Sequence, residues 1–235
     1  LKGHKNAVTQ VKWCANRSNL VSCSADETLI TWDANQGEFV RKFVHHNGIV
    51  NAVDVADSAP DLFASASDDK KVMLWDARHN GAPAATFAGS YAATSVALSP
   101  DGQRVYTGGV DGIIRGWDVR AGELKEPQPD TSPTSTPALT LYGCEHIVTG
   151  LALSPCGGRL LANAMDSRLR AFDVRAFCAA GPDRRLETLT EEVITGPKNS
   201  CFVVHGAPRG ILSRVGLQTA MCTFGTVPRR SKSIF

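Results

Sequence analysis

The stretch DKKVMLWD (Asp69–Asp76) decides the fold, because it places an aspartate six residues before a tryptophan–aspartate pair. The same spacing recurs three times along the chain, in the pairs Asp26 and Trp32, Asp111 and Trp117, and Asp166 and Phe172. An aspartate follows each of these aromatic residues. The four aromatic residues are 43, 42 and 55 positions apart, so the chain contains four copies of one unit.

Each unit contains three clear strands with turn signals between them. In the third unit, Thr94–Leu98 leads into Ser-Pro-Asp-Gly at 99–102, which is typical of a type I turn. Arg104–Gly108 and Ile113–Trp117 follow, and Asp111-Gly112 between them favours a tight hairpin. Short strands that repeat about every 40–45 residues and end in Trp-Asp predict an all-β fold, the WD-repeat β-propeller. Four blades are recognisable, at residues 1–44, 45–88, 89–142 and 143–190.

The repeated aspartates and aromatic residues have a structural interpretation. A carboxylate in the turn before the third strand can satisfy backbone N–H groups, and an aromatic ring on that strand can fill the space between blades. Acid–base chemistry or metal binding is the alternative, but identical placement in every blade is what a structural role predicts. We therefore expect turn aspartates at Asp26, Asp69, Asp111 and Asp166, and inter-blade aromatic residues at Trp32, Trp75, Trp117 and Phe172.

A Gly-His pair ahead of a unit would supply a histidine that hydrogen-bonds the turn aspartate. Gly3-His4 is the only intact pair in the chain. The second unit has His45-His46 at this place, and the third and fourth units also lack the pair. We expect the hydrogen-bonded network to be complete in the first blade and degraded in the other three.

Two segments depart from the repeats. Residues 126–137 are rich in proline, serine and threonine, which predicts a flexible surface insertion. After Arg175 the pattern stops, and we interpret residues 191–235 as a divergent, basic C-terminal segment.

The charge of the chain is unevenly distributed. Six of the 25 basic residues and none of the 23 acidic ones follow Glu192, so the rest of the chain has a formal charge of −4. An acidic body argues against a large nucleic-acid interface, so RNA contact is expected to be indirect or weak.

Several functional classes lack a sequence signal. The seven cysteines show no Cys-x-x-Cys spacing, which argues against a zinc site or a disulfide framework and favours a reducing compartment. We find no nucleophile motif, phosphate-binding glycine loop or metal-ligand cluster, and so expect no enzyme, cofactor, metal or small-molecule substrate. No apolar run approaches the length of a membrane span. Because Leu1–His4 already lies within a repeat, we expect further sequence ahead of it.

Some repeat residues are more specific than the general pattern. Most WD repeats carry Ser-Gly-Ser-x-Asp at the second turn, whereas this chain has Asn-Ala-Met-Asp at 163–166, followed by Phe172–Phe177. With Leu1–His4, Ser65–Asp69 and Gly108–Asp111, these residues make 1–190 similar to the WD-repeat subunits of the spliceosomal U5 small nuclear ribonucleoprotein. The resemblance implies a seven-bladed propeller, of which the four blades here form an incomplete or open part.

The resemblance also implies a function. Members of this family are nuclear, bind the large central U5 protein and other spliceosome components, and act as scaffolds in pre-mRNA splicing. Phe172 departs from the usual tryptophan; it keeps the packing of the aromatic ring and loses the indole N–H donor.

A second hypothesis rests on the ends of the third strands. The tetrapeptides Trp75–Arg78, Trp117–Arg120 and Phe172–Arg175 resemble the Trp-Asp-x-Arg box by which substrate receptors of cullin–RING ubiquitin ligases dock their adaptor. An exposed arginine there can pair with a carboxylate of the adaptor. The same box occurs in other WD proteins, so a generic WD-repeat adaptor is a further alternative. The candidate partner-binding residues are Arg78, Arg120 and Arg175.

Overall fold

The part of the chain that the structure describes folds into four antiparallel sheets of four strands each, which confirms the all-β prediction. The computed structural model describes residues 2–15, 18–79, 82–119, 137–166 and 168–175, and the backbone of 192–195. The strands of sheets 1 and 2 are β1 (Val8–Trp13), β2 (Asn19–Ser24), β3 (Leu29–Asp33), β4 (Glu38–Phe43), β5 (Val50–Val55), β6 (Leu62–Ser67), β7 (Lys71–Asp76) and β8 (Ala85–Ala88). Those of sheets 3 and 4 are β9 (Ala93–Leu98), β10 (Arg104–Gly109), β11 (Ile114–Asp118), β12 (Leu139–Leu141), β13 (Val148–Leu153), β14 (Arg159–Ala164), β15 (Arg168–Asp173) and β16 (Glu192–Thr195).

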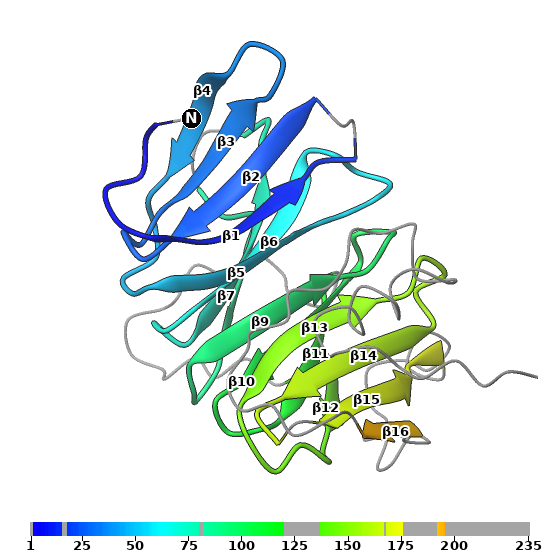
Figure 1. Ribbon diagram of the computed structural model, residues 1–235. Helices are drawn as coiled ribbons and strands as arrows, with labels where there is room; N and C mark the ends of the chain where they lie inside the picture. The colour runs from blue at the N-terminus through cyan, green and yellow to red at the C-terminus, as the bar shows by residue number, and fades with distance from the viewer. Residues whose placement is uncertain are drawn as a thin grey trace, which may run out of the picture.

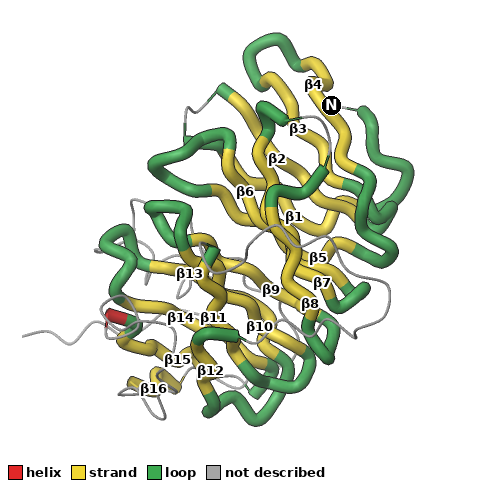
Figure 2. Tube along the Cα trace, turned by 180° about the vertical axis from the view of Figure 1, so that it is seen from behind, coloured by secondary structure: helices red, strands yellow, loops and turns green. Residues whose placement is uncertain are grey.

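The sheets stand side by side in a row, as the blades of a propeller do. Within each sheet, consecutive strands are hydrogen-bonded neighbours. The first strands of successive sheets contact one another, β1 with β5, β5 with β9, and β9 with β13. Figures 1 and 2 show this row from opposite sides, with sheets 1 and 4 at its two ends. Among the described residues no extensive contact joins sheet 1 to sheet 4, so the four blades form an open array.

The core lies between neighbouring sheets. Between sheets 1 and 2, Val21 and Leu29 pack with Phe43, Phe63 and Trp75. The ring of Phe43 lies edge-on to both Phe63 and Trp75, with centroids 5.3 and 5.4 Å apart. Similar clusters join sheet 2 to sheet 3 and sheet 3 to sheet 4. Strands with a sheet on either side are buried along both faces, which explains why β6 and β10 are buried at every residue but the first.

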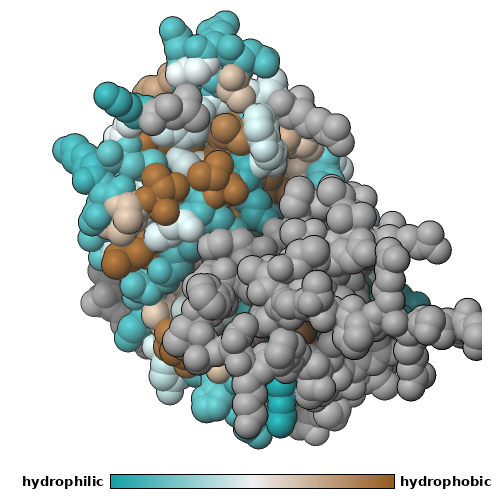
Figure 3. All heavy atoms as spheres, viewed as in Figure 1, coloured by the Kyte–Doolittle hydropathy of each residue, from teal (hydrophilic) through white to brown (hydrophobic). Residues whose placement is uncertain are grey.

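Sheet 1 has an open apolar face. Val11 and Trp13 on β1 are 50% and 57% exposed, whereas Val53 and Val55, at the same positions of β5, are buried. Val53 and Val55 pack against sheet 1, and no described residues form a sheet on the other side of β1. Figure 3 shows hydrophobic residues at the surface over sheet 1.

The end of sheet 4 differs from the expected division of the chain. Its fourth strand, β16, pairs with β15 and lies beyond the boundary expected at residue 190. The segment Glu-Val-Ile-Thr has the β-branched residues that favour a strand, but it is too short to stand out from the sequence. Residues 126–136 of the expected insertion, and the expected basic segment apart from 192–195, lie outside the described residues.

Candidate functional site

Each sheet has an aspartate in the turn between its second and third strands. The carboxylate accepts a hydrogen bond from the backbone N–H two residues further on, at N···O distances of 3.2, 2.9, 3.3 and 3.0 Å in sheets 1 to 4. In sheets 1 to 3 the intervening residue has a left-handed backbone, with φ of 67° at Glu27 and at Lys70 and 73° at Gly112. The side chain therefore closes a turn that the backbone alone leaves with an unsatisfied donor. The four aspartates are Asp26, Asp69, Asp111 and Asp166.

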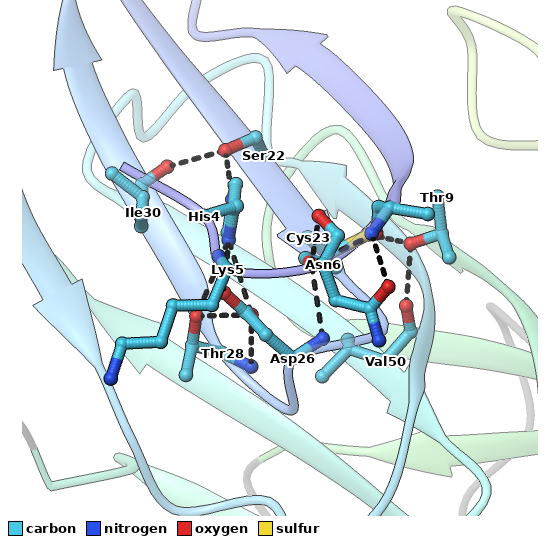
Figure 4. Close-up of polar contacts among 12 residues, drawn as sticks. His4, Lys5, Asn6, Thr9, Ser22, Cys23, Asp26, Thr28, Ile30 and Val50 are labelled. Atoms are coloured by element: carbon cyan, nitrogen blue, oxygen red, sulfur yellow. Dashed lines mark hydrogen bonds and ion pairs between the residues drawn. The ribbon is translucent and has the colours of Figure 1, made fainter. Parts of the chain in front are cut away.

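In sheet 1 the aspartate belongs to a hydrogen-bonded network with His4, Thr28 and Ser22 (Figure 4). His4 Nδ1 lies 3.1 Å from Asp26 Oδ2, and its Nε2 lies 2.7 Å from Ser22 Oγ. Trp32 Nε1–H donates to the same Ser22 oxygen at 2.8 Å. Because a carboxylate only accepts, His4 Nδ1 carries a proton and donates it to Asp26. The network joins the first loop to the turn and to two strands.

Sheet 2 contains the same network, so the expectation that it is confined to the first blade was wrong. His46 Nδ1 lies 2.8 Å from Asp69 Oδ2 and its Nε2 lies 2.7 Å from Ser65 Oγ. Trp75 Nε1–H donates to Ser65 at 2.8 Å. The geometry requires only a histidine at the buried position. His45 stands where sheet 1 has glycine, and its ring lies edge-on to Trp75.

Sheets 3 and 4 satisfy the aspartate with an arginine instead. Arg115 Nη2 lies 2.6 Å from Asp111 Oδ2, and Arg170 forms the equivalent ion pair with Asp166. Both arginines lie four residues after the aspartate, on the third strand of the same sheet. The side chain of Arg170 is 1% exposed and that of Arg115 is 18% exposed. Burial raises the pKa of Asp166, but the hydrogen bonds from Arg170 and from a backbone N–H lower it below its usual range.

The aromatic residues of the third strands are buried in all four sheets. Trp117 Nε1–H donates to Thr107 Oγ1 at 3.0 Å, as the tryptophans of sheets 1 and 2 donate to serine. In sheet 4 the aromatic residue is Phe172, and Ala162 occupies the position of the hydroxyl. Sheet 4 therefore lacks both the indole N–H donor and the hydroxyl acceptor, so neither group is left buried without a partner.

The aspartate–histidine–serine networks contain the residue types of a hydrolase triad, but they are buried. His46 and Ser65 are inaccessible to solvent, and Ser65 Oγ already accepts from Trp75. Burial raises the pKa of Asp69, and the hydrogen bond and charge of His46 lower it, with a net shift below its usual range. The pKa of Asp26 is likewise lowered by its hydrogen bonds, against an opposing effect of burial. Ionised, buried and fully hydrogen-bonded groups of this kind hold the blade together and are closed to a substrate.

The candidate partner-binding arginines lie at the opposite end of the sheets, after the third strand. Arg78 and Arg175 are 71% and 70% exposed, and each folds back onto the aspartate two residues before it. Arg78 Nη2 lies 2.7 Å from Asp76 Oδ2, and hydrogen bonds from Arg175 lower the pKa of Asp173 to about 2. The guanidinium groups are accessible but already paired with a carboxylate. Arg120 lies outside the described residues.

Other kinds of site have no support in the described part of the chain. Those residues contain no group of three or more histidine, cysteine or acidic side chains that could hold a metal ion. No helix among them is long and apolar enough to cross a bilayer.

Sequence reasoning missed the partners of the aspartates, although the sequence contains a signal for each. The hydroxyl groups lie four residues before the aspartate, at Ser22, Ser65 and Thr107, and the fourth sheet has Ala162 there. The arginines lie four residues after it, in the two units that lack the histidine network. Comparing the four units position by position would have found both.

Comparison with known proteins places the chain among WD-repeat proteins. The model of the WD domain, G-beta repeat, matches residues 1–33, 37–76 and 81–118. The U5 small nuclear ribonucleoprotein 40 kDa protein of Dictyostelium discoideum is 35% identical over 123 residues, which are 52% of this chain and 34% of that protein. Pre-mRNA-splicing factor cwf17 of Schizosaccharomyces pombe is 40% identical over 121 residues, 51% of this chain and 35% of that protein.

Signalling proteins also match, at lower identity. The guanine nucleotide-binding protein subunit beta of Oryza sativa subsp. indica is 28% identical over 236 residues, 95% of this chain and 55% of that protein. The matched region thus spans about a third of the two splicing relatives and about half of the G-protein subunit.

Proposed function

Because the chain is a WD-repeat protein, we propose that it is a non-enzymatic scaffold of the U5 small nuclear ribonucleoprotein, mediating protein contacts in pre-mRNA splicing. The main support is its 35–40% identity to two splicing relatives, against 28–32% to G-protein beta subunits. The specific residues at 163–166 and 172–177 point in the same direction. Since the chain spans about a third of these relatives, their role is carried over as part of the proposal.

The architecture suits a scaffold. Four sheets packed through apolar cores form a stiff body, and their turns offer two separate surfaces, one at each end of the strands. We propose that the repeats at 1–190 rather than the segment 191–235 carry the contacts, that the partners include the large central U5 protein, and that the protein acts in the nucleus. The acidic balance of residues 1–195 supports contacts with protein rather than direct contacts with RNA.

Affinity purification tests the proposal. The tagged chain is expressed in cells, recovered from nuclear extract, and its associated RNA is quantified. We expect enrichment of U5 small nuclear RNA and of the large central U5 protein over a tag-only control, and retention of both after mild salt washing. Recovery of neither would overturn the splicing assignment. Microscopy of the tagged chain checks the nuclear location.

A cullin–RING substrate receptor is the second candidate, favoured by the exposure of Arg78 and Arg175. Both guanidinium groups would have to exchange their own aspartate for a carboxylate of the adaptor. The same purification separates the candidates, since a receptor recovers cullin and adaptor and loses them when Arg78→Ala and Arg175→Ala are combined. A splicing scaffold retains the U5 components in that variant.

A further inference from the structure

The loop between β4 and β5 contains an asparagine–glycine pair, Asn47 and Gly48, directly after the buried histidine of sheet 2. Asn47 is exposed, and its side chain makes no hydrogen bond to a described residue. The backbone N–H of Gly48 has no hydrogen-bond partner in the described part of the chain either. Because glycine lacks a side chain, its nitrogen is accessible and its backbone turns easily. A free side-chain amide thus stands next to a free backbone nitrogen.

These two groups can react with each other, and the reaction needs only water. The nitrogen of Gly48 loses its proton and attacks Cγ of Asn47, and the side-chain amide leaves as ammonia. Water then opens the five-membered imide that has formed. Attack at Cγ gives aspartate. Attack at the main-chain carbonyl gives isoaspartate, in which the main chain runs through Cβ and Cγ and the α-carboxylate is free.

The structure distinguishes Asn47 from the other exposed asparagines that it describes, Asn6 and Asn35. The backbone nitrogen that follows each of those two is hydrogen-bonded to a side-chain oxygen, at 2.8 and 3.1 Å. The residue that follows also has a side chain in both cases, an alanine and a glutamine. Among the exposed asparagines of the described ranges, Asn47 alone is therefore followed by a nitrogen that is free to attack.

The loop is tied to the turn of Asp69 on both sides of the reacting bond. Asn47 N–H donates to Asp69 Oδ2 at 3.1 Å, and Ser67 Oγ donates to Gly48 O at 3.1 Å. A Cβ on Gly48 would lie 2.9 Å from Asp69 N, so the loop lies directly on the turn. Isoaspartate lengthens the main chain between these two hydrogen bonds by one carbon–carbon bond, about 1.5 Å. Both hydrogen bonds cannot keep their present geometry after that change.

We propose that Asn47 is a site of spontaneous deamidation, and that the isoaspartate formed there weakens the attachment of the β4–β5 loop to the turn of Asp69. Sheet 1 has the same attachment without the reactive pair, because Lys5 stands at the position of Asn47 and its N–H donates to Asp26 Oδ2 at 2.7 Å. The inference rests on the exposure and hydrogen bonding of one loop and is independent of the splicing assignment.

Peptide mapping tests the first part of the proposal. The folded chain, and the same chain unfolded in urea, are incubated side by side in mildly alkaline buffer and digested with trypsin at intervals. Fragment masses then show where an amide has become a carboxyl group, and methylation by a protein isoaspartate methyltransferase shows isoaspartate. We expect the folded chain to lose the amide of Asn47 well before those of Asn6 and Asn35. Reaction at Asn47 in urea but not in the folded chain would overturn the proposal.

The stability of the aged protein tests the second part. The experiment uses an Asn80→Gln background, because Asn80 and Gly81 form another asparagine–glycine pair, which lies outside the described residues. The aged charge variant is collected by ion exchange, its isoaspartate content at residue 47 is measured, and its urea midpoint is compared with that of the unreacted chain. We expect a lower midpoint for the isoaspartate form.

Two matched variants separate the longer main chain from the new charge. Asn47→Asp has the added carboxylate and the ordinary main chain, so it should unfold at a higher urea concentration than the isoaspartate form. Asn47→Gln would have to form a six-membered ring, so it should keep its midpoint through the same incubation. An isoaspartate form as stable as Asn47→Asp would overturn the proposed effect on the turn.

Discussion

At the level of single residues, the turn aspartate interacts with two different types of side chain in the same molecule. A histidine from the preceding loop hydrogen-bonds it in sheets 1 and 2, and an arginine from the following strand pairs with it in sheets 3 and 4. The second solution leaves a permanent charge inside the protein, because arginine does not lose its proton. A buried arginine is stable only while its carboxylate is present, so the pair is mutually dependent.

Arg170→Ala is expected to lower the free energy of unfolding by about 3–5 kcal/mol, since it leaves the Asp166 carboxylate buried without its ion pair. Arg115→Ala should cost about 1 kcal/mol, because that pair is partly solvated. Urea unfolding followed by tryptophan fluorescence measures both. Arg168→Ala is the control; Arg168 is exposed on the same strand, and its loss should change stability by about 0.5 kcal/mol or less. Equal costs at 168 and 170 would contradict the buried pair.

The turn aspartates also predict a dependence on pH. The pKa values of Asp26, Asp69 and Asp166 are lowered in the folded state from an ordinary value of 3.8. Their stabilisation is fully present above that value and is lost as the pH falls below it, because the unfolded chain then binds more protons than the folded one. Asp69→Asn should be less stable than the parent at pH 7, with a difference that narrows below about pH 4. Urea titrations at pH 7, 4 and 3 measure it, and a constant difference would rule out this origin.

At the level of strands, the two faces of a sheet differ in what covers them. Phe43 and Phe39 lie on the same strand, β4, but Phe43 is 1% exposed between sheets 1 and 2, and Phe39 is 50% exposed beside Trp32. Burial between sheets, rather than the identity of the side chain, therefore decides how much each phenylalanine stabilises the protein.

Phe43→Ala is expected to cost about 3–5 kcal/mol, as for other fully buried phenylalanines. Phe39→Ala should cost about 1 kcal/mol, mainly through its edge-on contact with Trp32. The midpoints of urea unfolding give both values on the same scale. If Phe39→Ala were as costly as Phe43→Ala, the face of sheet 1 that carries Phe39 would have to be covered in solution.

The strands were predictable from the sequence, and the networks between them were less so. Alternating apolar residues and turn dipeptides located the first three strands of every sheet, because these signals are local. The fourth strand of sheet 4 escaped notice because it is four residues long and follows a stretch without repeats. The histidine network of sheet 2 was missed because the search required a glycine before His46, whereas the structure requires only that the histidine be buried. The exchange of histidine for arginine depends on which side chains meet, and no single strand pattern contains that information.

At the level of the whole molecule, the sheets formed by the described residues pack extensively only against their neighbours, so a substitution between two sheets should have a local effect. Gly108 lies at the seam between sheets 3 and 4, where a Cβ would lie 2.5 Å from Val148 Cγ1. A larger residue there must push sheet 4 away from sheet 3.

Gly108→Val should therefore raise hydrogen exchange in sheet 4, at residues 148–173, and leave sheet 1 unchanged. Mass spectrometry of peptic fragments measures both regions in one experiment. Gly89→Ala is the control, because a Cβ there meets its nearest atom at an ordinary 3.5 Å. Faster exchange throughout the molecule would show instead that the four sheets unfold as one unit.

The exchange of histidine for arginine has a consequence for the order of folding. His4 and Asp26 are 22 positions apart and His46 and Asp69 are 23 apart, whereas each arginine is four positions from its aspartate. Contacts close in sequence need little loop closure and form early. We expect the hairpins β10–β11 and β14–β15 to gain protection before the histidine networks, in a pulse-labelling hydrogen-exchange experiment during refolding. The two arginine pairs would then make sheets 3 and 4 the nucleus from which the described sheets fold.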